Sequence, residues 1–124
     1  MKGNNNVKWI QYLLLILAAA IIVAGFVKMN SGSDGQQWFF RNQQLLNQHY
    51  EKHGIEMGFS SAEEYEAAAS AVVNNPAALH KTEAEDGDDV YYVESTNDFV
   101  IVSTDGYIRT YFRPDAGIKY YNRQ

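Results

Sequence analysis

Two histidines stand four residues apart near the middle of the chain, in the segment HYEKH. If this segment is helical, His49 and His53 lie on one helix face, with Lys52 beside them. Imidazole changes charge near neutral pH, so such a pair could act as general acid and base and exchange protons with a ribose hydroxyl.

The same spacing allows two other interpretations. H-x-x-x-H is a frequent spacing of metal ligands, although a third ligand would have to come from His80 or from an acidic residue. Alternatively, two polar residues at a helix end cap its carbonyl groups and interact favourably with its dipole. The spacing alone leaves acid–base chemistry, metal binding and capping open.

A second group of candidate residues lies near the C-terminus, in the segment YIRTYFRP at 107–114. The guanidinium of Arg109 can bind a phosphate through two parallel hydrogen bonds. Tyr107 and Tyr111, on the same strand face, could stack on bases, and Arg113 is a further candidate for substrate binding. An ordinary exposed strand face has the same composition, so both interpretations stay open.

Two helices are predicted to position the histidines. The first covers residues 38–53, with Gly54 as a left-handed stop. The second begins at Ser60 or Ser61, where Ser61 and Glu64 form a capping box, and it ends at residues 74–76. Residues 77–89 are predicted to be a surface loop, and its run of acids is interpreted as solvated rather than as a calcium site.

The rest of the chain is predicted to form antiparallel strands at residues 90–93, 99–103 and 107–113, with a short edge strand at 117–121. Asp105-Gly106 is a two-residue hairpin turn. It pairs Ile101 with Thr110, and it puts Arg109 and Thr110 on opposite faces. The face that receives the helices is predicted to carry Phe99, Ile101, Ile108, Thr110 and Phe112. The fold class is therefore α+β: two helices packed on a small antiparallel sheet. The predicted core is Trp38, Leu46, Tyr65, Val72, Ile101 and Phe112.

An apolar segment at residues 9–27 precedes this domain and is long enough to span a bilayer as a helix. We expect residues 1–28 to be a membrane anchor or a signal sequence, 29–36 a flexible linker, and 37–124 the folded domain. The positive charges of Lys2 and Lys8 predict a single-pass protein of the cytoplasmic membrane. Its N-terminus would lie on the inner side of that membrane and its C-terminal domain outside. Secretion after cleavage is the alternative.

Composition narrows the possible functions. The chain has no cysteine, which excludes disulfides and thiolate metal sites. After Lys28 there are 7 basic and 15 acidic residues, a net charge of 7 − 15 = −8. This balance is unlike that of a non-specific nucleic-acid binder, although a local basic patch remains compatible with it.

Three motifs in order resemble a known family. They are LNQHYEKHGIEMGF at 46–59, SSAEEY at 60–65 and DGYIRTYFRP at 105–114. Together they resemble the C-terminal toxin domain of bacterial polymorphic and contact-dependent toxins, which is similar to the barnase–EndoU–colicin–RelE superfamily of ribonucleases. The resemblance covers roughly residues 42–121 and implies helices on an antiparallel sheet, RNA cleavage without a metal or other cofactor, and a small immunity protein as partner. It also implies a functional cleft, formed by His49, Lys52, His53, Arg109 and Thr110.

Two hypotheses from different classes follow. The first is a membrane-tethered or exported, toxin-like, metal-independent endoribonuclease. The second is a non-catalytic binding module, anchored in the cell envelope, that uses its tyrosine-rich sheet face to hold a protein or a cell-wall component.

Overall fold

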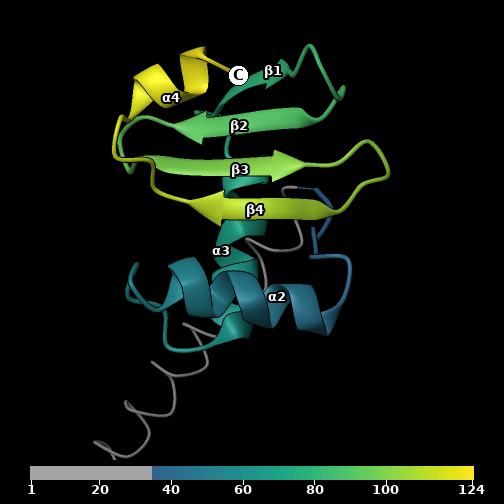
Figure 1. Cartoon of the computed structure of the whole chain (residues 1–124), viewed down its shortest axis with the longest axis vertical. Helices are drawn as coiled ribbons and strands as arrows, with labels where there is room; N and C mark the ends of the chain where they lie inside the picture. Colours follow the sequence, from purple (N-terminus) through teal and green to yellow (C-terminus); the bar gives the residue numbers. More distant parts are fainter. Residues whose placement is uncertain (1–34) are drawn as a thin grey trace, which may run out of the picture. The chain divides into compact units, whose positions relative to one another are not determined.

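The computed structural model describes residues 35–124, of which residues 36–124 form one compact unit. The elements are two helical segments, a four-stranded antiparallel sheet in the order β1-β2-β3-β4, and a short C-terminal helix (Figure 1). The predicted α+β class is confirmed. No helix within residues 35–124 combines the length and the apolar character that a membrane crossing requires. The predicted anchor and most of the predicted linker lie outside the described residues.

The first helix begins later than predicted. Helix α2 spans Gln43–His49, because the side chain of Asn42 caps it by accepting a hydrogen bond from the Leu45 amide at 2.9 Å. Trp38 precedes the helix, and its amide donates to the Ser70 hydroxyl at 2.9 Å. After α2 the backbone widens into a π-helical turn, η1, at Tyr50–Gly54. Such turns are rare and frequently lie at functional sites.

Gly54 was predicted to be a left-handed stop, and this is wrong. The glycine with positive φ after this helical segment is Gly58, at 94°, whereas Gly54 closes the π-turn and is buried. Its role is close packing, since a Cβ here would lie 2.4 Å from Cδ1 of Tyr50 and 3.0 Å from the ring of Tyr65.

Helix α3 spans Ala62–Asn74 and begins with the predicted capping residues. The Ser61 hydroxyl accepts from the Glu64 amide at 3.1 Å, and the Glu64 carboxylate accepts from the Ser60 amide at 3.1 Å. The helix buries Tyr65, whose hydroxyl donates to the carbonyl of Tyr111 in the sheet. This hydrogen bond ties α3 to the edge strand of the sheet.

The strands are β1 (Leu79–Thr82), β2 (Asp89–Val93), β3 (Asp98–Val102) and β4 (Ile108–Phe112). Strand β1 lies inside the segment that was predicted to be a loop, so that prediction is wrong for these four residues. The edge strand predicted at 117–121 is instead helix α4 (Ile118–Asn122). Gly117, with φ at 57°, redirects the chain before it, and Tyr121 packs on Tyr92 at 5.8 Å between ring centroids.

The hairpin register is confirmed at the centre and differs at the turn. Ile101 pairs with Thr110, as predicted, but Val102 pairs with Ile108, which leaves Arg109 as an extra residue in a bulge. The Ile108 amide donates to the carbonyl of Phe39 at 2.8 Å, and Phe40 forms a parallel bridge with Ile108. The segment before α2 therefore extends the sheet at this point.

The prediction of the helix-covered face is confirmed for Ile108 and wrong for Phe99, Ile101 and Phe112. Helices α2 and α3 pack on the face of Val93, Val100, Val102, Ile108 and Tyr111, together with Phe40, Leu46, Tyr65 and Val72. The bulge turns Ile108 to this side. The opposite face carries Val90, Tyr92, Phe99, Ile101 and Phe112 and is covered by α4. Of the predicted core, Leu46, Tyr65 and Val72 are buried, whereas Trp38, Ile101 and Phe112 are only partly buried.

Candidate functional site

A cavity of about 590 Å³ opens beside the end of α2, the β3–β4 turn and the loop between β1 and β2. Three of the predicted site residues line it: His49, Tyr107 and Arg109. Arg41 also lines it and was not predicted. The fold therefore brings together one imidazole, two guanidinium groups and one phenol ring from distant parts of the sequence.

Arg109 owes its position to the bulge and to Asp88. Its Nη1 lies 2.5 Å from the Asp88 carboxylate and 4.0 Å from that of Asp86. Asp88 is 5% exposed at its side chain, while that of Arg109 is 55% exposed. The Asp88 carboxylate raises the pKa of the Arg109 guanidinium. Within residues 35–124 the other N–H groups of Arg109 make no hydrogen bond, so they can bind an anion that enters the cavity.

His49 is the last residue of α2, and its ring lies against Phe40 at 5.1 Å between centroids. Burial lowers the pKa of its imidazole, and nearby His53 and Lys52 lower it further. Its Nδ1 is buried and has no hydrogen-bond partner among the described residues. The lowered pKa favours the neutral imidazole, which is the form that a general base requires.

His53 lies in the π-turn, with its ring centroid 6.2 Å from that of His49. Burial lowers its pKa, Lys52 lowers it as well, and Glu56 opposes the shift. The ring stacks on Phe112 at 5.3 Å. His53 lines a second cavity, of about 240 Å³, together with Glu56, Met57, Phe112, Arg113 and Asp115. The histidine pair thus has one member in each cavity.

The remaining predicted residues lie outside the larger cavity. Lys52 is exposed and lines neither cavity. Thr110 lines neither cavity either, since it faces Ile101 on the α4 side of the sheet. Arg113 lies in the smaller cavity and donates to the carboxylate of Asp98 at 3.0 Å.

The assignment of Tyr111 as a base-stacking residue needs correction. Its side chain is 1% exposed, because the sheet face that it shares with its partner Val100 is the face that the helices cover. The hydroxyl donates to the Asp98 carboxylate at 2.9 Å, and burial raises its pKa well above the usual value for a tyrosine. A ring in this position supports the core and offers no open face to a base.

Arg41 is the site residue that sequence reasoning missed. It lies directly after the segment that pairs with β4, and its guanidinium is 4.6 Å from the centre of the Tyr107 ring. It also binds Asp105 of the β3–β4 turn at 2.6 Å. These partners are remote in sequence, so no local pattern indicates the contact.

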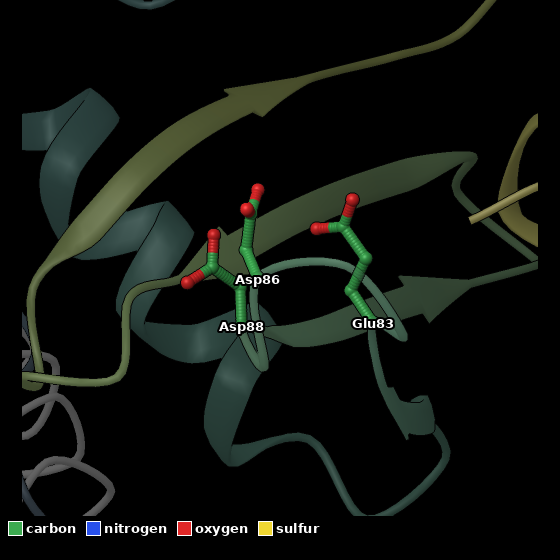
Figure 2. A group of neighbouring side chains, drawn as sticks. All are labelled: Glu83, Asp86 and Asp88. Atoms are coloured by element: carbon green, nitrogen blue, oxygen red, sulfur yellow. The ribbon is translucent and has the colours of Figure 1, made fainter.

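The acidic loop meets the same cavity. Figure 2 shows Asp86 and Asp88 side by side on the loop between β1 and β2, with Glu83 nearby. Their carboxylate oxygens lie within 4.8 Å of one another, which is a spacing that a metal ion could use. The carboxylates of Asp86 and Asp88 already face the Arg109 guanidinium. In this structure the acidic cluster therefore positions the Arg109 side chain.

The chain matches no protein-family model and no curated protein. Its structure is similar to a ribonuclease from Escherichia coli that was solved in complex with its inhibitor protein. The two share 20% sequence identity with a TM-score of 0.51, over 62% of this chain and 95% of the ribonuclease chain. At this identity the likeness shows a common fold, and the function has to be argued from the site.

Proposed function

We propose that the domain is a metal-independent endoribonuclease with a toxin-like role. The observation that carries the proposal is the position of His49. A partly buried imidazole, whose buried Nδ1 has no hydrogen-bond partner among the described residues, lines a cavity that also holds Arg109. The ring centroid of His53 lies 6.2 Å from that of His49. The similarity in fold to a ribonuclease supports the same conclusion.

In the proposed reaction, His49 takes the proton of a ribose 2′-hydroxyl while that oxygen attacks the neighbouring phosphorus. The bond from phosphorus to the 5′-oxygen breaks, and His53 or Lys52 supplies the proton to this leaving oxygen. The products are a 2′,3′-cyclic phosphate and a free 5′-hydroxyl. Because the ribose supplies the nucleophile, no metal-activated water is needed.

Arg109 would stabilise the charge that develops on the phosphate oxygens. The buried carboxylate of Asp88 holds one side of the Arg109 guanidinium and leaves its exposed side free. The guanidinium is therefore already oriented before a substrate phosphate binds. Arg41, stacked on Tyr107, supplies a second cation in the same cavity.

The test uses the purified full-length protein and a mixed RNA in excess chelator. We expect cleavage with 2′,3′-cyclic phosphate ends and a bell-shaped pH profile. His49→Ala should lower the rate by about a hundredfold or more. His80→Ala is the matched control, since His80 lies on β1 and lines neither cavity, and its rate should be unchanged. Cleavage that disappears with chelator would contradict the proposal.

One observation favours the alternative of a non-catalytic binding module. Asp86, Asp88 and Asp105 line the same cavity, and they would repel the phosphates of an RNA strand. A cationic protein segment would fit these carboxylates. Folded protein that cleaves no RNA, with or without metal ions, would make this module the better account.

We also propose, from the sequence, that residues 9–27 anchor the chain in the cytoplasmic membrane with the domain outside.

The ribonuclease of similar fold was solved with an inhibitor protein. We therefore propose a small immunity protein as a partner of this domain. Co-purification with the product of an adjacent small gene is the direct test, and such a partner should suppress the cleavage.

A further inference from the structure

Aromatic rings form a continuous series from the histidine pair to the C-terminal helix. The His53 ring stacks on Phe112 at 5.3 Å, and Phe112 meets Tyr120 edge to face at 5.4 Å. The guanidinium of Arg123 lies 5.7 Å from the centre of the Tyr120 ring. In Figure 1 the end of β4 and helix α4 lie on the same side of the view as the C-terminal end of α2. We call His53, Phe112, Tyr120, Arg113 and Arg123 the aromatic track.

The track is accessible at every member. The three rings are partly exposed, and both arginines are exposed. The cavity of about 240 Å³ lies on it, between His53, Phe112 and Arg113. The arginines are two of the seven basic residues after Lys28, and Arg113 is paired with Asp98 at 3.0 Å. Glu56 and Asp115 at the cavity and Asp98 beside Arg113 are the acids that face it.

We propose that the aromatic track binds the single-stranded part of an RNA substrate next to the bond that is cut. The inference rests on the proposed ribonuclease function and specifies its substrate as RNA with unpaired bases. Unpaired bases stack on aromatic side chains, and arginines beside the rings bind the phosphates between them. In a duplex the faces of the bases are covered by their neighbours, so base-paired RNA cannot use the rings.

The track begins at His53, a proposed acid of the reaction, so a strand that lies on it delivers its next phosphate to the histidine pair. This direct connection to His53 distinguishes the track from an apolar patch that has no relation to the proposed reaction. It also explains the division of the histidines: His49 faces the cavity with Arg109, and His53 faces the cavity where the track begins.

Binding is measured apart from cleavage, with a fluorescent 2′-O-methyl hexanucleotide that lacks the attacking hydroxyl. The full-length protein should bind the single strand at least tenfold more tightly than the same sequence in a duplex. Tyr120→Leu keeps an apolar side chain but removes the ring, and should weaken binding by about fivefold or more. Arg123→Gln should reduce the slope of log affinity against log salt by about 0.7.

Lys81→Gln is the control for charge. Its ammonium lies over Tyr121, at 4.4 Å, and contacts no ring of the track. This variant should bind the hexanucleotide with the salt slope of the parent protein. Because Arg123 is exposed, its variant tests the track even if Tyr120→Leu is poorly folded.

The inference is overturned if Arg123→Gln and folded Tyr120→Leu bind like the parent protein, or if duplex and single strand bind equally. Cleavage that persists in that case leaves the ribonuclease function standing and assigns the track to a protein partner. Tight, track-dependent binding without cleavage of ordinary RNA would sustain the track and refute the ribonuclease.

Discussion

Substituting Gly54 by alanine tests how closely the π-turn η1 packs against the core. The added Cβ would lie 2.4 Å from Cδ1 of Tyr50 and 3.0 Å from the ring of Tyr65. Neither ring can easily move away. The Tyr50 hydroxyl donates to the carbonyl of Phe59 at 2.8 Å, and the Tyr65 hydroxyl donates to the carbonyl of Tyr111. The methyl group must therefore displace the backbone of η1.

The expected cost follows from three contributions. Overpacking a filled core costs about 1–3 kcal/mol. Loss of the Tyr50–Phe59 hydrogen bond adds about 1 kcal/mol, and alanine in a helix regains about 0.5–1 kcal/mol relative to glycine. We expect a net loss of about 2 kcal/mol in the free energy of unfolding. For a unit of this size, that lowers Tm by about 8–16 °C.

Chemical and thermal unfolding, followed by circular dichroism, measure this loss. Tyr50→Ala supplies the sharper comparison, because removing the ring removes the closest contact. In that background Gly54→Ala should cost at least 1 kcal/mol less, a coupling within the range of contacting residues. An unchanged or higher Tm for Gly54→Ala alone, or an equal cost in both backgrounds, would refute the packing argument. The proposed cleavage of RNA should be slower in this variant as well, since η1 carries His53.

Three further predictions concern pH, domain boundaries and topology. The pKa of His49 is lowered by folding, so this imidazole binds protons more readily in the unfolded chain, and its contribution to stability declines as pH falls through about 6.5. His49→Gln should reduce this decline between pH 7 and 5, as measured by urea unfolding. Residues 36–124 alone should fold and melt cooperatively; an aggregated or molten product would contradict the boundary. A reporter fused after Gln124 should be active only outside the cytoplasmic membrane, and cytoplasmic activity would reverse the predicted orientation.

Local signals in the sequence predicted the parts of the fold that local interactions determine. The capping interaction at Ser61 acts within a few residues and is found where it was predicted. The turn at Asp105-Gly106 is also present, but it is one residue longer than predicted, since the Ser103 amide donates to the carbonyl of Tyr107. The predicted pairing of Ile101 with Thr110 is found because the bulge at Arg109 offsets the longer turn. The likeness of the fold to a ribonuclease also agrees in part with the family resemblance of the motifs.

The features of the fold that the sequence did not predict depend mostly on contacts between residues far apart in the chain. The bulge at Arg109 accompanies the hydrogen bond from Ile108 to Phe39, and no pattern near residue 109 indicates that partner. This bulge moves Ile108 to the face of Val100, and Tyr111 is buried because the helices cover that face. Strand β1 was missed because three of its four residues are exposed, so the alternation of apolar and polar residues is absent. Arg41 enters the site through contacts that only the folded chain creates.

The two edges of the sheet differ in how they meet other molecules. Along β4, the chain at Phe39 and Phe40 occupies the hydrogen-bonding positions beside Ile108. At the other edge, β1 is only four residues long and carries Lys81, while His80 is bound to Asp89 at 2.8 Å. Short, charged edge strands discourage pairing with a strand of a second molecule. When many copies are crowded together, this edge chemistry opposes aggregation through shared sheets.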